Sequence, residues 1–309
     1  MRPATLADLA QQHGMEVPAT SGYGDFTAFS AMYIAACGVL QRPEDMDRVV
    51  GEVAEDAAND GAVWVEPSFE PHVHVPTFGS VEAVIETAVS VAEEASRATG
   101  IGVGLMVACD RTADPANAIE SARAAVKHAG AGVVSFGLDN DETIGPPEWF
   151  AEAFAIARDG GLLSTPHAGE LVGPESVIGA LDSLQADRIL HGVRAIEDPA
   201  LVERLASDGV CLDVCPTSNL LLSVADSYDD HPLGALLDAG VRCSLNADDS
   251  LLFGASLLDE YQLCRDAFGF DDERMASIAG ASVMASGAPD ESKATAVAAV
   301  AAWAAGDSR

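Results

Sequence analysis

Residues 160–193, GGLLSTPHAGELVGPESVIGALDSLQADRILHGV, carry the pattern that decides the fold of this chain. A short apolar run at Leu162–Pro166 predicts a β-strand, and a second run at Arg188–His191 predicts another. Between them, Pro174–Leu184 predicts an amphipathic helix that begins at a proline, as many helices do. A strand, a helix and a second strand in this order are typical of a parallel sheet covered by helices.

The same alternation extends outward over the 309 residues. Further strands are predicted at Ala62–Val65, Gly102–Ala108, Gly132–Gly137, Val210–Cys215 and Arg242–Asn246. Further helices are predicted at Thr5–His13, Thr27–Leu40, Pro43–Asn59, Ser80–Ala98, Pro115–Ala129, Pro147–Asp159, Pro199–Ser207 and Pro232–Ala239. No linker or low-complexity stretch divides residues 1–309, so we expect a single domain.

The predicted fold class is α/β, a (β/α)8 TIM-type barrel that lacks its first strand in this chain. Seven strands are predicted, whereas a closed barrel of this kind has eight. The residues before Ala62 favour helices and contain no good strand. Either the barrel is open or its first strand is encoded upstream of Met1, and we expect the upstream strand.

The composition excludes several classes of partner. The chain has 16 lysine and arginine residues against 49 aspartate and glutamate residues, a net charge of −33. Such a surface repels phosphate backbones and anionic lipids, so we expect neither nucleic acid nor a membrane as a partner. No apolar run approaches the roughly 20 residues of a membrane span, and we expect a soluble, cytoplasmic protein.

The six cysteines are spread thinly and are expected to be small buried residues. The sequence leaves the oligomeric state open.

Polar residues gather where the last four predicted strands end. These ends contain Thr-Pro-His-Ala-Gly-Glu at 165–170, Ile-Leu-His-Gly at 189–192, Cys-Pro-Thr-Ser-Asn at 215–219 and Asn-Ala-Asp-Asp at 246–249. Singly, a strand-end histidine is more often structural, and Asp-Asp before Ser can cap a helix. Since the carboxyl ends of barrel strands converge on one mouth, the four motifs together predict a site with metal ligands, a general acid and a base.

These four motifs closely resemble the adenosine deaminase family, including its adenine and aminodeoxyfutalosine branches. The resemblance runs from Arg2-Pro3-Ala4-Thr5-Leu6 to the end of the sequence GFDDE at 269–273. It implies one Zn²⁺ per complete site, bound by two histidines of the first strand together with His167 and Asp248. It also implies a small-molecule purine as the partner.

The resemblance further implies a role for each site residue. A metal-bound hydroxide would attack C6 of the purine at the zinc held by Asp248, and ammonia would leave. Glu170 would protonate ring nitrogen N1, and His191 would orient the attacking water and stabilise its charge. Asp249 would hydrogen-bond N7.

The turn that begins at Gly137 would lie near purine N3. Asn140 stands there where adenosine deaminases have glycine and adenine deaminases have small polar residues, although Asn140 is equally compatible with a simple turn. Adenosine or a related nucleoside is the first substrate that we consider, and adenine is the second.

The sequence departs from the family at its start. The family opens with a His-x-His strand, whereas this chain begins within the segment that follows it, so we expect zinc to be weakly held by His167 and Asp248 alone. His72 and His74 could replace the missing ligands if the segment were extended, because side chains two apart share one side of a strand. We favour the interpretation that both histidines lie in a loop.

Two other functions stay open at this point. One is a catalytically inactive barrel that binds a purine or a protein partner. The other is a related metal-dependent hydrolase of another ring or amide substrate. We expect a metal-dependent purine aminohydrolase, since Glu170, His191, Asp248 and Asp249 occur together and are needed for chemistry more than for packing.

Overall fold

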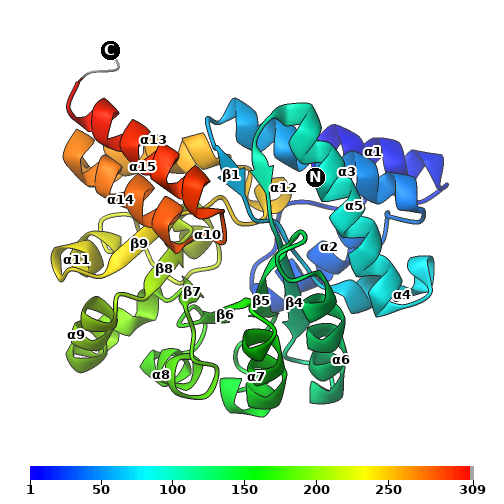
Figure 1. Cartoon of the computed structure of the whole chain (residues 1–309), viewed down its shortest axis with the longest axis horizontal. Coiled ribbons are helices and arrows are strands. Elements are labelled where there is room, and N and C mark those ends of the chain that lie inside the picture. The colour runs from blue at the N-terminus through cyan, green and yellow to red at the C-terminus, as the bar shows by residue number, and fades with distance from the viewer. Residues whose placement is uncertain (307–309) are drawn as a thin grey trace.

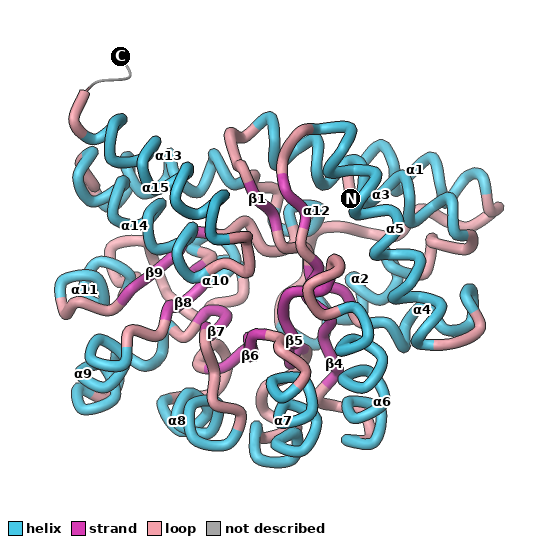
Figure 2. The backbone as a smooth tube through the Cα atoms, in the orientation of Figure 1, coloured by secondary structure: helices cyan, strands magenta, loops and turns pink. Residues whose placement is uncertain are grey.

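The computed structural model describes residues 1–306, and its centre is a seven-stranded parallel sheet (Figure 1 and Figure 2). The strands pair in the order β2-β4-β5-β6-β7-β8-β9. Their bounds are Ser68–Phe69 (β2), Leu105–Asp110 (β4), Val133–Asp139 (β5), Leu163–Ala168 (β6), Arg188–His191 (β7), Cys211–Val214 (β8) and Arg242–Leu245 (β9). Within residues 1–306, no strand pairs with the free edges of β2 and β9, so the seven-strand barrel is open there. The predicted fold class is confirmed.

Two of the predicted strands are interrupted. A second, two-stranded sheet pairs β1 (Trp64–Val65) with β3 (Gly102–Val103), and each leads directly into its neighbour in the main sheet. Gly102 and Gly104 make room for the Trp64 indole, since a Cβ atom would lie 2.1 Å from its ring at the first position and 2.5 Å at the second. The strand expected at Ala62–Val65 is therefore shorter than predicted, and a separate short strand, β2, follows it in the chain.

Helices cover the outside of the sheet, as the alternation predicts (Figure 1). Proline occupies the first turn of several of them, where its missing N–H group is not needed. The helices that precede β9 are α1 (Pro3–Gln12), α2 (Phe26–Cys37), α3 (Pro43–Asn59), α4 (Pro71–Phe78), α5 (Val81–Thr99), α6 (Pro115–Ala125), α7 (Ala151–Asp159), α8 (Pro174–Ser183), α9 (Pro199–Asp208), α10 (Pro216–Leu221) and α11 (Leu233–Asp238).

Two helical predictions are incomplete. The helix expected at Pro115–Ala129 ends in a separate 3₁₀ turn, η1 (Val126–His128), and the one expected at Pro147–Asp159 begins as the 3₁₀ turn η2 (Pro147–Phe150). The 3₁₀ turn η3 (Val193–Glu197) follows β7 and was not predicted. Four helices after β9 were also not predicted: α12 (Ser250–Phe253), α13 (Leu257–Phe268), α14 (Asp272–Ala285) and α15 (Asp290–Ala304).

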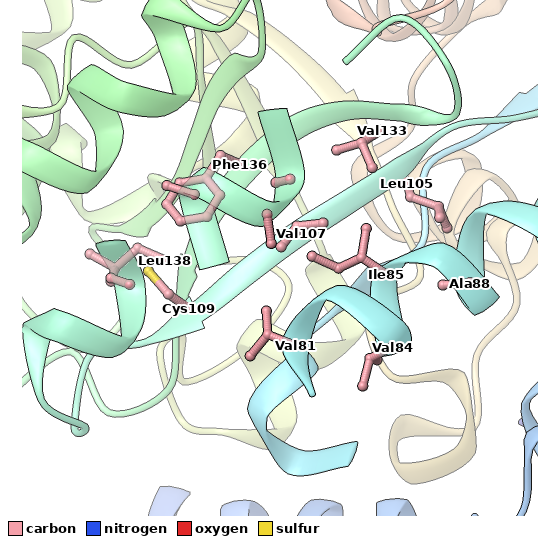
Figure 3. Close-up of a cluster of buried hydrophobic side chains, with 14 of the residues drawn as sticks. Val81, Val84, Ile85, Ala88, Leu105, Val107, Cys109, Val133, Phe136 and Leu138 are labelled. Carbon is pink, nitrogen blue, oxygen red and sulfur yellow. The ribbon is translucent and has the colours of Figure 1, made fainter. Parts of the chain in front are cut away.

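One face of α5 packs against the first strands of the main sheet (Figure 3). Val81, Val84 and Ile85 recur at helical spacing and are almost fully buried. They face apolar side chains of β4 and β5, among them Val107 and Phe136. A second buried cluster joins β6 to β9 with the helices from α8 onward. The packing fixes the strands whose ends form the site.

A buried charged group links the two halves of the open sheet. Arg188 opens β7, and its guanidinium lies 2.6 Å from the Glu66 carboxylate and 3.2 Å from that of Asp213 in β8. Glu66 follows β1 and also accepts a hydrogen bond from the Gly287 backbone N–H group, beyond α14. Segments that are far apart in the sequence are therefore held together below the site.

All six cysteines are free thiols, and five are buried, which agrees with the expected small buried residues. Over residues 1–306, no single helix is long and apolar enough to cross a membrane; α4 and α5, bent by 97°, meet the length and composition criteria only as a pair.

Candidate active site

Three of the predicted site residues meet at the carboxyl ends of the strands. His191 ends β7, Glu170 follows β6, and Asp248 follows β9. His191 Nε2 lies 3.6 Å from Glu170 Oε1 and 3.9 Å from Asp248 Oδ2. The His167 ring in β6 is 5.2 Å from the His191 ring, centre to centre. Parallel pairing of β6 with β7 brings these histidines together, because it sets Ala168 opposite His191.

The backbone at this site is strained. Only five described non-glycine residues have a positive φ, and three of them are predicted site residues: Asn140 at 72°, His191 at 62° and Asp248 at 52°. Residues other than glycine rarely adopt this left-handed backbone conformation. Such strain is concentrated at functional sites. Backbone strain is therefore present at residues that the sequence motifs single out.

Burial shifts the proton affinity of the site. It raises the pKa of Glu170 to about 7, with Asp248 and Glu142 adding repulsion and His191 opposing the shift. Burial and the neighbouring Asp248 raise the pKa of Asp249 to about 8. Burial lowers the pKa of His167 to about 3. The folded chain thus favours an uncharged imidazole at His167 and a protonated carboxyl at Asp249 near neutral pH.

The loop that carries Glu170 is held by a carboxylate that the sequence analysis missed. Glu142 is 5% exposed, and it accepts backbone hydrogen bonds from Gly169 at 2.5 Å, Glu170 at 3.0 Å, Leu171 at 2.6 Å and Val172 at 2.8 Å. These consecutive N–H groups form a concave anion site, and Glu142 fills it from the turn after β5.

Arg111 holds the end of β6, just before this loop. Its guanidinium is buried, attracts the Glu142 carboxylate, and donates a hydrogen bond to the His167 backbone carbonyl at 2.6 Å. A lone glutamate in a turn and an arginine after β4 give no sequence signal for this role, since their partners lie on other strands.

The residues present fit a zinc ion in their chemistry. His167 Nδ1 donates to the Leu138 backbone carbonyl at 2.9 Å, which leaves Nε2 free and oriented, as in histidines that bind metals. Neutral imidazole and carboxylate are both good zinc ligands, so His167 and Asp248 would hold the ion. His191, Cys215 and Asp248 have potential donor atoms within 4.8 Å of one another. Cys215 is thus a further candidate that the sequence analysis treated as a small buried residue.

His72 and His74 do not complete this cluster. The prediction that they lie in a loop is wrong, because Pro71–Phe78 is helix α4, begun by Pro71 and capped by Glu70, which accepts from the His72 N–H group. Residues two apart on a helix point in different directions. His72 contacts Glu70 and the α6 residues Glu120 and Ser121, whereas His74 packs near the Phe78 ring.

Comparison with known proteins identifies the family. The family model described as adenosine deaminase matches residues 1–303. The chain belongs to the adenosine deaminase family. A Streptomyces coelicolor relative, provisionally named adenosine/adenine deaminase, is 45% identical over 98% of this chain and 93% of its own length. Membership makes the chain a purine aminohydrolase.

Two solved structures share the fold closely. The crystal structure of adenine deaminase from Arthrobacter aurescens has a TM-score of 0.91 and 29% identity, covering 98% of this chain and 94% of that one. A Burkholderia ambifaria amidohydrolase with bound Zn also has a TM-score of 0.91, at 28% identity, covering 99% of this chain and 87% of that one.

Asn140 and Gly137 are the two remaining predicted site residues of this adenosine deaminase family member. Asn140 directly follows β5, and its side-chain oxygen accepts from the Asp141 N–H group at 2.9 Å and from the Ser30 hydroxyl in α2 at 3.4 Å. Gly137 lies inside β5, where a Cβ atom would contact the side chains of Met106 and Ala108. The substrate-binding roles of both stay predictions.

An aromatic cluster beside the site was also missed. The Phe29 ring in α2 stacks on the Phe253 ring in α12, 5.0 Å centre to centre, and Tyr23 packs edge-on against both. The Tyr23 hydroxyl donates to the Leu252 carbonyl at 3.1 Å. Because α12 directly follows Asp249, these rings give the family's strand-end carboxylates an apolar neighbour.

Proposed function

We propose that the chain hydrolyses the 6-amino group of a purine at the cluster of Glu170, His191 and Asp248, with one Zn²⁺ held there. Adenosine or a related nucleoside is the first substrate, and adenine is the second. The observation that carries the proposal is that the Glu170 and Asp248 carboxylates both lie within 3.9 Å of His191 Nε2 at the strand ends, on backbone that is strained at His191 and Asp248.

Each residue has a part that its position supports. Glu170 is buried 3.6 Å from His191, where it can deliver a proton to ring nitrogen N1 of a bound purine. His191 faces both Glu170 and Asp248 through Nε2, which suits it to orient the water and stabilise the charge that forms on its oxygen. Asp249, beside the apolar rings of α2 and α12, is the partner for N7.

His167 and Asp248 would bind the metal ion. Zinc bound there would supply Lewis-acid activation of the attacking water. The free Nε2 of His167 and the carboxylate of Asp248 supply two of the protein ligands, fewer than the three usual at a catalytic zinc site. We therefore propose weak binding of the ion by the 309-residue chain.

The substrate order is tested by measuring ammonia release from adenosine and from adenine side by side, with zinc added. We expect a higher kcat/KM for adenosine, and a higher value for adenine would reverse the order while leaving purine deamination intact. No ammonia from either substrate, by a chain that is folded and binds zinc, would contradict the proposed function.

The metal proposal has its own test. Equilibrium dialysis with zinc compares the wild-type chain with His167→Ala and, as a control, with His128→Ala in η1, a histidine that no site motif contains. We expect His167→Ala alone to weaken zinc binding. Equal binding by all three would refute the assignment of His167.

A further inference from the structure

Two buried side chains, those of His231 and Asn219, connect a backbone N–H group to His191. The Leu233 N–H group, in the first turn of α11, donates to His231 Nδ1 at 3.2 Å. His231 Nε2 lies 3.2 Å from the side-chain oxygen of Asn219 in α10, and the Asn219 amide nitrogen lies 3.3 Å from His191 Nδ1. His231 is 7% exposed, Asn219 is fully buried and His191 is 3% exposed, so water does not replace these contacts.

The direction of every hydrogen bond in this series follows from the first one. A backbone N–H group can only donate, so His231 Nδ1 must accept and the ring proton must sit on Nε2. Burial lowers the pKa of His231 to about 4, so the ring takes up no second proton near neutral pH. Nε2–H donates to the Asn219 oxygen, which turns the NH₂ end of the amide toward His191.

We propose that His231 and Asn219 are positioning residues that hold the His191 ring with its proton on Nε2. An NH₂ group can only donate, so His191 Nδ1 accepts from Asn219. Nε2–H then points toward Glu170 and Asp248, at 3.6 and 3.9 Å. His191 therefore offers a hydrogen-bond donor, and no lone pair, to the oxygen that reacts there.

The consequence for turnover rests on the proposed deamination, whereas the place of the proton follows from the hydrogen bonds alone. A donor aimed at the reacting oxygen stabilises negative charge as it develops. Removal of a partner that orients a functional histidine typically lowers activity by about 10- to 100-fold. Neither Asn219 nor His231 contacts the reacting atoms, so their effect passes through His191.

The chain offers variants that separate polarity from packing. His231→Gln keeps one acceptor for the Leu233 N–H group and one donor for Asn219, so it should preserve the series. His231→Leu has neither and frees the Asn219 amide to turn. Asn219→Asp is nearly isosteric but has only acceptors, so His191 Nδ1 must become a donor. Asn117→Asp, in α6 on the outside of the sheet, adds the same charge as a control.

The readout is the protonation of the His191 ring nitrogens in the full chain labelled with ¹⁵N-histidine. Two-bond ¹H–¹⁵N correlations distinguish a protonated ring nitrogen from a bare one, and loss of a signal in His191→Gln assigns the residue. We expect a bare Nδ1 in the wild type and in Asn117→Asp, and a protonated Nδ1 in Asn219→Asp. We also expect kcat to fall about 10- to 100-fold in His231→Leu and to stay close to wild type in His231→Gln.

Two outcomes would overturn the proposal. One is a wild-type His191 that carries its proton on Nδ1, and the other is an Asn219→Asp variant with Nδ1 still bare. If the wild type shows the expected nitrogen signals but releases no ammonia from any 6-aminopurine, the proposed function fails while the positioning role of Asn219 stands. If ammonia is released and His231→Leu turns over as fast as His231→Gln, the positioning role in catalysis fails while the function stands.

Discussion

Replacing Glu142 by glutamine should loosen the loop that carries Glu170. Three of its four backbone hydrogen bonds go to Oε2 and one, from Gly169, goes to Oε1. Glutamine has one side-chain oxygen, so at least one buried N–H group loses its acceptor and faces an NH₂ group instead. An unsatisfied buried donor costs about 1–3 kcal/mol, and the remaining bonds weaken because they lose the charge.

Burying a neutral amide is easier than burying a carboxylate, which offsets part of this loss. We therefore expect the free energy of unfolding to fall by about 2–4 kcal/mol in Glu142→Gln. Because a displacement of about 1 Å at a catalytic group can cost about 100-fold in rate, kcat should fall by that order while KM changes little.

The assay combines urea unfolding with amide hydrogen exchange of residues 169–172. Asp141→Asn is the matched control, since this neighbouring carboxylate accepts hydrogen bonds only from Thr143 among the described contacts. We expect faster exchange at 169–172 in Glu142→Gln and no change in Asp141→Asn. Unchanged exchange together with an unfolding free energy within about 0.5 kcal/mol of wild type would refute the reasoning.

Three further predictions concern a buried ion pair, a buried carboxyl group and the aromatic cluster. Arg188→Met leaves two buried carboxylates unpaired, so urea unfolding should show a loss of about 3–5 kcal/mol, and a loss below about 1 kcal/mol would contradict the linking role. Burial raises the pKa of Glu260 from 4.5 to about 7, so the stability from its bound proton is complete below pH 4.5 and is lost as the pH rises through 7. Glu260→Gln should therefore gain in Tm over wild type between pH 5 and 8, and a constant difference would disprove the shift. In Phe29→Ala, loss of the stacked ring should lower the unfolding free energy by about 3–5 kcal/mol, and an unchanged urea midpoint would contradict it.

The alternation of short apolar runs with amphipathic runs was sufficient to predict the sheet and most of its helices. It worked because each run of this chain matches the side-chain period of the element it forms, as Val81, Val84 and Ile85 do in α5. It failed at 71–78, where we expected His72 and His74 to lie in a loop but Pro71 begins helix α4. The side on which His72 and His74 point depends on that local conformation.

The strand-end motifs predicted which side chains meet, but the groups that hold them could not be predicted. Glu142, Arg111 and His231 act on residues of other strands and turns, and a single sequence carries no information on such pairings until the fold brings them together. The motif Cys-Pro-Thr-Ser-Asn did contain Asn219, although its hydrogen bond to His191 appears only in the structure.

The central claim is hydrolytic deamination at Glu170, and product analysis in ¹⁸O-water tests it most directly. The zinc-supplied wild-type chain and Glu170→Gln are each incubated with a 6-aminopurine, and ammonia and the oxygen at position 6 are measured. We expect one ¹⁸O atom in the product for each ammonia released by the wild type, and a rate at least about 100-fold lower in a folded Glu170→Gln variant. Release at the wild-type rate by Glu170→Gln, or ammonia without ¹⁸O in the product, would contradict the claim.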